Sequence, residues 1–164
     1  MSPPAPENAW QAAHAELLCR SYQHWTQRPL LPDLPQLQGA DLGRALWQAP
    51  FALLSHDTAS DPLLTYGNQT TLRLFDYPWP TFITTPSRFT AEAPEREERS
   101  RLLQRVREHG FIDDYSGTRI ARDGRRFRIH RATVWNLIDD AGRPLGQAAT
   151  FSEWTEIPPT EARD

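Results

Sequence analysis

Apolar and polar residues alternate along three runs between residues 111 and 154, and two turn sequences separate these runs. The turns contain Asp123-Gly124 and the tetrapeptide Asp-Asp-Ala-Gly at 139–142. A period of two is typical of strands, and an Asp-Gly pair between two such runs favours a tight antiparallel connection. The pattern therefore predicts a three-stranded antiparallel meander.

Two shorter strands are predicted upstream of the meander, at residues 51–57 and 63–67. Ser60, Asp61 and Pro62 supply the turn chemistry between them, so the two strands should pair as a hairpin. A helix-rich stretch separates this hairpin from the meander. This order of elements predicts an α+β fold with one antiparallel sheet and helices over one of its faces.

A first helix is predicted near the amino terminus, where Asn8 and Gln11 suit a helix start. Prolines 29, 32 and 35 end it and form a linker to a short helix that includes Trp47. The apolar stripe of the first helix either packs on the chain's own domain or pairs with a second copy of the chain. The residues of this stripe are Trp10, Ala13, Leu17, Leu18, Tyr22 and Trp25.

Two further helices are predicted between the hairpin and the meander. Asn68 suits the N-cap of a short helix, and Gly110 suits the end of a longer helix over residues 95–109. The charged residues of the longer helix, with Glu95 and Arg99 spaced as a surface pair, are interpreted as a solvent-exposed face. Its buried side carries Leu102, Leu103 and Val106.

The composition is that of an ordinary globular protein of 164 residues with a formal net charge of -3. Neither the charge nor any apolar run indicates a nucleic-acid or membrane partner. The amino terminus does not resemble a secretory signal, and the single cysteine, Cys19, cannot form an internal disulfide, so a cytoplasmic location is predicted. The chain contains no lysine, which excludes Schiff-base and phosphate-loop lysine sites.

Five sequence blocks between Leu17 and Trp154 resemble a known family. The blocks are LSHDTASDPLLTYGNQTTLRLFD, PSRFTAE, REERSRLLQRVREHGFIDDYSGTRI, GRRFRIHRATVWNLID and GQAATFSEW. Together they resemble the MEKHLA domain, a PAS-like family that is also found attached to plant transcription factors. The resemblance implies a five-stranded antiparallel sheet with helices over one face, and a sensory or ligand-binding role.

The sequence patterns and the resemblance together divide the chain into four expected parts. Residues 1–7 are expected to form a disordered tail, and residues 8–48 the amino-terminal helix, the proline-rich linker and the short helix. Residues 49–156 are expected to form the PAS-like domain. Residues 157–164 are expected to form a second disordered tail.

Strand alternation points to a possible ligand pocket. Phe127, Ile129, Arg131, Thr133 and Trp135 would share one face of their strand. The same rule selects a face of the last strand, and the resemblance turns two further residues toward the same interior. The candidate ligand-binding residues are Arg131, Thr133, Trp135 and Gln147 from alternation, and Arg119 and His56 from the resemblance.

A buried guanidinium group needs a negative partner. Either an internal carboxylate neutralises Arg119 and Arg131, or a small anionic ligand does. Structural ion pairs are the commoner reason for such residues, and the sequence leaves both possibilities open.

Other chemistries find less support. Ser55-His56-Asp57 reads like a hydrolase triad, but alternation along a strand turns the histidine away from its two neighbours. The histidines lack the spacing of a metal site. Compared with PAS cofactor sites, flavin-cysteine photochemistry is disfavoured because no cysteine stands near the pocket, and haem would have only His109 as a loose axial candidate.

Two functions follow from these patterns, and neither is catalytic. The first is a sensory module that binds a small ligand between sheet and helices and acts on an unidentified signalling partner. The second is a protein-interaction or dimerisation module with a filled core and no ligand. A group of arginines in the meander is interpreted as a solvated hairpin and not as a nucleic-acid site, because aromatic residues are not interleaved with it. These arginines are residues 119, 122, 125, 126, 128 and 131.

Overall fold

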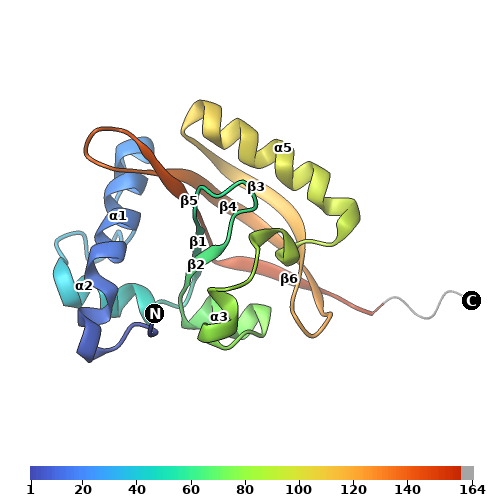
Figure 1. The fold of residues 1–164 in the computed structure, drawn as a ribbon, viewed down its shortest axis with the longest axis horizontal. Coiled ribbons are helices and arrows are strands. Elements are labelled where there is room, and N and C mark those ends of the chain that lie inside the picture. The colour runs from blue at the N-terminus through green and yellow to red at the C-terminus, as the bar shows by residue number, and fades with distance from the viewer. Residues whose placement is uncertain (160–164) are drawn as a thin grey trace, which may run out of the picture.

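One antiparallel sheet forms the centre of the computed structural model, which describes residues 1–159, with the strand order β2-β1-β5-β4-β3 (Figure 1). The predicted hairpin and meander are both confirmed. A further strand, β6, continues β5 after Ser152 and pairs with the first half of β4. The strands are β1 (Ala52–His56), β2 (Leu64–Gly67), β3 (Phe111–Ile120), β4 (Arg126–Ile138), β5 (Pro144–Phe151) and β6 (Glu153–Ile157).

Helices cover both faces of this sheet. On the first face, Leu102 and Val106 of α5 pack on Val134, and Phe75 of α3 packs on Phe127 of β4. On the second face, Leu18 of α1 packs on Leu53 of β1. No helix within residues 1–159 is long and apolar enough to cross a membrane. The helices are η1 (Pro6–Gln11), α1 (Ala12–Thr26), α2 (Gly39–Trp47), α3 (Gln69–Phe75), α4 (Trp79–Phe82), η2 (Ser87–Thr90) and α5 (Ala93–His109).

We call the first face the cavity face and the second the N-terminal face. The resemblance implied helices on one side only, and the PAS-like part of the chain follows this arrangement with α3 and α5 on the cavity face. The additional amino-terminal segment supplies the cover of the N-terminal face (Figure 1). The sheet is therefore the middle layer of three.

A β-bulge at Arg131 changes which way the side chains of β4 point. Tyr115 of β3 pairs with Ala132, whereas Gly117 pairs with Ile129, so β4 has one residue more than β3 between these pairs. Arg131 has a φ of 53°, which is unusual for a residue other than glycine. A second extra residue, Asp114 with a φ of 59°, lies in β3 nearby.

The predicted common face of alternate β4 residues is therefore wrong. Phe127 and Ile129, before the bulge, pack on the cavity face with Phe75 of α3. Beyond the bulge the alternation is shifted by one residue, and Trp135 packs in the cluster of the N-terminal face. The prediction fails because the extra residue in β4 has no partner in β3 and reverses the direction of every side chain after it.

The apolar stripe of α1 packs on the chain's own sheet. The Tyr22 ring lies edge-on to Trp135, with 5.0 Å between ring centroids. The indole Nε1 of Trp25 donates a hydrogen bond to the carbonyl of Asn136 at 2.9 Å, and its ring lies against Gly110. Packing within the domain, one of the two interpretations of this stripe, is therefore present in the structure.

The amino terminus is folded, although residues 1–7 are expected to be disordered. Trp79 Nε1 donates a hydrogen bond to the carbonyl of Met1 at 3.0 Å. The side chain of Asn8, expected to start a helix, accepts a bond from the Ala5 amide at 3.0 Å and so closes a 3-10 turn. The first α-helix begins later, at Ala12. At the other end, β6 extends to Ile157, and residues 160–164 of the expected tail lie outside the described residues.

Asn68 is a buried junction between α2, β1 and α3. Its Oδ1 accepts hydrogen bonds from the amides of Thr71 and Leu53 at 3.1 and 3.2 Å, which confirms the predicted helix cap. Its Nδ2 donates to the carbonyls of Leu46 and Phe51 at 3.0 and 2.9 Å. The amide group thus uses both its acceptor and its donors.

Asn68→Asp tests this junction. The substitution keeps the helix-capping oxygen but places a carboxylate against two buried carbonyl groups, so we expect the free energy of unfolding to fall by about 3 kcal/mol or more. Urea denaturation followed by circular dichroism measures it. Gln104→Glu, the same chemical change on an exposed position of α5, should shift the value by less than about 1 kcal/mol. Equal effects of the two substitutions would contradict the assignment.

His14 joins α1 to the sheet by a chain of hydrogen bonds. Its Nε2 lies 2.9 Å from Oγ of Ser55, which lies 2.9 Å from Oγ1 of Thr65. The imidazole also contacts the Tyr66 ring, with 5.4 Å between centroids. Burial in this contact lowers the pKa of His14 from 6.5 to about 4.

The lowered pKa of His14 makes folding sensitive to acid. Between pH 6.5 and about 4 the unfolded chain binds this proton and the folded chain does not, so stability is complete above pH 6.5 and is lost as the pH falls through that window. The loss attributable to His14 should reach about 3 kcal/mol at most. His14→Gln should flatten the pH dependence of urea unfolding, whereas His24→Gln, at an exposed position, should not.

Candidate functional site

A cavity of about 60 Å³ lies between the cavity face of the sheet and the helices that cover it. At about 10–15 Å³ of such volume for each water, it has room for roughly four to six waters or as many non-hydrogen ligand atoms. Its apolar walls include Leu54, Phe75, Leu102, Ile129, Val134 and Phe151. Polar residues that line it include His56, Ser87, Thr90, Arg99, Tyr115, Arg119 and Gln147, and Ser55 of β1 also borders it.

Arg119 lines the cavity from β3, as the resemblance implied, and is 8% exposed. Its Nη1 donates to the carbonyl of Thr118 at 2.8 Å, and its Nη2 donates to the hydroxyl of Tyr115 at 3.2 Å. The guanidinium carbon also lies 5.6 Å from the centroid of the Tyr115 ring. These neutral partners hold the side chain in place without cancelling its charge.

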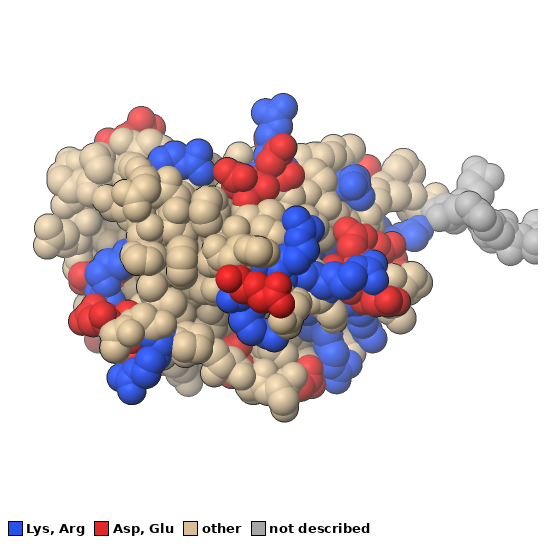
Figure 2. Space-filling model, turned by 90° about the horizontal axis from the view of Figure 1, so that it is seen from above, with Lys and Arg blue, Asp and Glu red and all other residues tan. Residues whose placement is uncertain are grey.

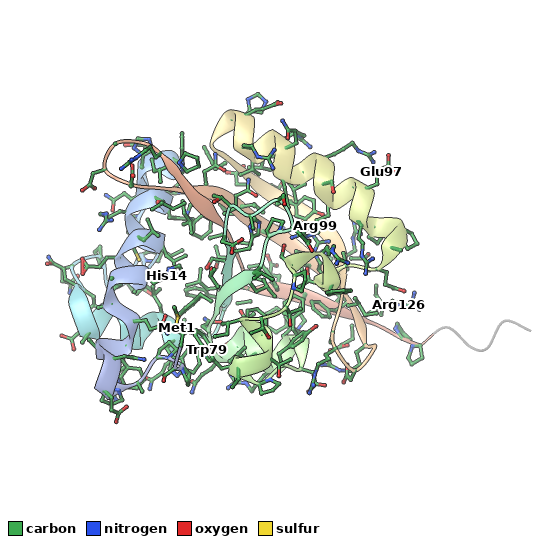
Figure 3. The ribbon with its side chains drawn as sticks, viewed as in Figure 1. Met1, His14, Trp79, Glu97, Arg99 and Arg126 are labelled. Carbon is green, nitrogen blue, oxygen red and sulfur yellow. The ribbon has the colours of Figure 1, made fainter. Side chains whose placement is uncertain are left out.

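Arg99 lines the same cavity from α5, and sequence reasoning missed it. The residue is 9% exposed and does not form the expected surface pair with Glu95. Figure 3 shows Arg99 on the sheet side of α5 and Glu97 on its outer side, where Glu97 pairs with Arg101 at 3.0 Å. The Nη2 of Arg99 donates to Oγ of Ser87 at 2.7 Å.

The two buried arginines form an uncompensated positive site. Within residues 1–159, no carboxylate lies within 4.0 Å of either guanidinium group. Burial, together with the neighbouring charge of Arg119, lowers the pKa of Arg99 to about 10. Among residues 1–159, the internal carboxylate that was one of the two expected partners of Arg119 is therefore absent. By contrast, acidic and basic side chains are interspersed on the outer surface over α5 (Figure 2).

His56 and Gln147 stand opposite each other on β1 and β5 and both line the cavity. Gln147 Nε2 donates to the carbonyl of Leu103 on α5 at 3.0 Å and to Oδ1 of Asn136 at 3.1 Å. Asn136 Nδ2 in turn donates to the carbonyl of Val106 at 2.9 Å. These bonds tie the covering helix to the two central strands.

The other three candidate residues do not reach the cavity. Arg131 lies at the bulge, its side chain is 75% exposed, and its Nε is 3.8 Å from Glu153 Oε2. Thr133 and Trp135, beyond the bulge, point to the N-terminal face, where Trp135 is fully buried. Placing these three in the pocket was wrong for one reason, the shifted alternation of β4.

The residues considered for other chemistries are dispersed. Ser55 bonds to His14 on the N-terminal face, whereas His56 lines the cavity on the opposite face, so the apparent triad is divided as alternation predicts. His109 is exposed at the end of α5. Among residues 1–159 no three His, Cys, Asp or Glu side chains are grouped so that they could hold a metal ion. The meander arginines do not form one free patch, since Arg125 pairs with Asp123 and Glu156.

The family model of the MEKHLA domain matches residues 12–156, a span that includes the whole cavity lining. The chain belongs to the MEKHLA domain family. This MEKHLA domain is similar to the homeobox-leucine zipper protein ATHB-14 of Arabidopsis thaliana, with 25% identity over 142 residues. The match covers 85% of this chain but only 17% of that protein, so the chain spans less than a fifth of its curated relative.

Solved structures show that this MEKHLA domain has a PAS-like fold. A PAS domain of a Colwellia psychrerythraea protein has a TM-score of 0.59 at 15% identity, over 70% of this chain and 92% of that one. An RNA-binding light-oxygen-voltage receptor also reaches 0.59, at 23% identity, over 77% and 33% of the two chains. The light-oxygen-voltage protein of Rhodobacter sphaeroides gives 0.56 at 13% identity, over 72% and 66%. The predicted α+β, PAS-like fold is confirmed.

The cavity does not fit a flavin, although similar folds include light-oxygen-voltage domains. Its volume of about 60 Å³ is well below the roughly 300–1,000 Å³ of typical cofactor pockets. Cys19 lies on α1, on the opposite side of the sheet. Burial, assisted by the charge of Glu16, raises the pKa of its thiol to about 12, which makes the reactive thiolate scarce.

Arg119→Met distinguishes a structural arginine from one that awaits a ligand. Because no carboxylate would be left without its partner, we expect the free energy of unfolding of the ligand-free protein to stay unchanged or to rise by about 1 kcal/mol. If Arg119 formed a structural ion pair, the substitution would instead lower the free energy of unfolding by about 3 kcal/mol or more. Urea denaturation of protein dialysed into chloride buffer provides the measurement. The exposed Arg101→Met serves as the control for the loss of one positive charge.

Proposed function

We propose that this MEKHLA domain is a sensory module that binds a small anionic ligand in the cavity between the sheet and α5. The PAS-like fold, shared with sensory light-oxygen-voltage proteins, supports the general role. One observation carries the specific role: Arg99 and Arg119 line one cavity and have no carboxylate partner among residues 1–159. An anion bound there would gain charge-assisted hydrogen bonds in a site screened from water.

The ligand in this proposal is small and partly apolar. The volume of about 60 Å³ suits a molecule of a few atoms. The apolar walls favour an alkyl part beside the charged group, and a short carboxylate has both. The polar residues proposed to contact it are Arg99, Arg119, His56 and Gln147.

Binding without catalysis is the form of function that these residues favour. The hydroxyls of Ser87 and Thr90 are engaged, since Ser87 accepts from Arg99 and Thr90 donates to the Ser87 carbonyl at 2.8 Å. Neither is paired with a base in the described part of the chain. The alternative of an interaction module with a filled core has less support, because the core contains a cavity with polar lining residues.

A ligand in the cavity would change the packing of α5, which covers it. Arg99 belongs to α5, and Gln147 holds that helix through the Leu103 carbonyl. In the proposed mechanism, an anion draws Arg99 and Arg119 together and so alters the packing of α5, and in turn of α1. The signalling partner would read this change.

Thermal unfolding of the purified chain tests anion binding. With propionate in place of chloride at equal ionic strength, we expect the midpoint to rise by about 3–5 °C once the ligand is tenfold above its Kd. Arg119→Gln and Arg99→Gln should each abolish the rise. Arg131→Gln, which removes an exposed arginine from the same sheet, should retain it.

Two results would overturn the proposed function. One is the absence of any midpoint change with propionate, acetate or phosphate relative to chloride. The other is an equal change in Arg119→Gln and in the wild-type chain, because the anion would then bind elsewhere on this arginine-rich surface.

A further inference from the structure

The imidazole of His56 has one nitrogen fixed by the backbone. Its Nδ1 lies 2.8 Å from the carbonyl oxygen of Asp57. A carbonyl oxygen only accepts hydrogen bonds, so Nδ1 must carry the hydrogen and donate it. The tautomer of the neutral ring is thereby set, and Nε2 is left as the second site on the ring.

The other nitrogen of His56 is a hydrogen-bond acceptor that lacks a donor. Burial, opposed by the bond to Asp57 and assisted by the charge of Arg99, lowers the pKa of His56, so the ring is neutral at pH 7. In the neutral ring with hydrogen on Nδ1, Nε2 carries a lone pair. Nε2 is buried and has no hydrogen-bond partner among residues 1–159. A buried acceptor without a donor is costly, which makes it a place where a ligand gains affinity.

Gln147 adds a second acceptor to the same wall. It pairs with His56 across β1 and β5 on the cavity face. Its Nε2 hydrogens are used for Leu103 and Asn136, so its carbonyl oxygen is the part left for a ligand. The cavity therefore has donors with positive charge at the arginines and acceptors at the histidine and glutamine.

We infer that the ligand is a small hydroxy acid, whose carboxylate binds Arg99 and Arg119 and whose hydroxyl donates a hydrogen bond to Nε2 of His56. This inference rests on the proposed anion site and adds the requirement for a donor. A hydroxyl suits the site better than an ammonium group, because two guanidinium charges are already present. The apolar walls favour an organic acid over phosphate, and four to six non-hydrogen atoms match glycolate or lactate.

Pairs of acids that differ by one hydroxyl test the inference. Binding of lactate and propionate, and of glycolate and acetate, is measured by calorimetry on the full chain at pH 7.5 and constant ionic strength. Lactate, in at least one of its two enantiomers, should bind about tenfold more tightly than propionate, because only lactate supplies the missing donor. Glycolate should exceed acetate in the same direction.

His56→Phe removes the acceptor while keeping a ring of similar size. The preference for lactate over propionate should vanish in this variant, whereas propionate should still bind through the two arginines. His109→Phe, at an exposed position of α5, should keep the preference. If His56→Phe does not fold, the ratio of lactate to propionate affinity in the wild-type chain still decides the question.

The outcomes separate the two claims. Equal affinity for lactate and propionate would overturn the hydroxy-acid assignment and leave the anion site in place. Binding of neither acid, nor of phosphate, would overturn both. Tighter binding of phosphate than of lactate would also overturn the assignment, since the apolar part of the ligand would then contribute nothing.

Discussion

At Arg131 the long strand β4 has one residue more than β3 can pair with, and every side chain beyond that point has changed faces. The first half of the strand pairs with β6 and presents Ile129 to the cavity. The second half pairs with β5, and beyond the bulge it presents Trp135 to α1 and Val134 to α5. The bulge therefore determines which residues of β4 face the cavity and which face α1.

The cavity combines apolar walls with two buried positive charges. Its walls are large apolar side chains that come from the sheet, α3 and α5. Within them, Arg99 and Arg119 are held by a serine hydroxyl, a tyrosine hydroxyl and a backbone carbonyl. Such neutral partners fix the direction of a guanidinium group but do not neutralise its positive charge. Burying these two charges among neutral partners therefore costs local stability.

Much of the fold could be predicted because its signals are local. Asp-Gly turns delimit the meander, and the Asn68 cap needs only the residues that directly follow it. The bulge gave no such signal, because Arg131 has a positive φ without being glycine, and the extra residue exists only relative to the partner strand. The amino-terminal turn likewise depends on a contact between Met1 and Trp79 that is remote in sequence.

The candidate site was only half predicted. Arg119, His56 and Gln147 line the cavity as expected, partly through the family resemblance, whereas Arg131, Thr133 and Trp135 do not. Arg99 was missed, although it stands three residues before Leu102 and therefore on the buried side of α5. The high charge of that helix concealed it. The helical period predicts that Arg99 is buried, whereas the many charged residues of the helix suggest that it is exposed.

Asn136 makes hydrogen bonds to residues on both faces of the sheet. Its side chain accepts from Gln147 in the cavity lining, and its backbone carbonyl accepts from the indole of Trp25 on α1. Its backbone amide also donates to the carbonyl of Gly110, against which the same indole lies. The cavity lining and α1, on opposite faces of the sheet, are consequently joined through one residue and two hydrogen bonds.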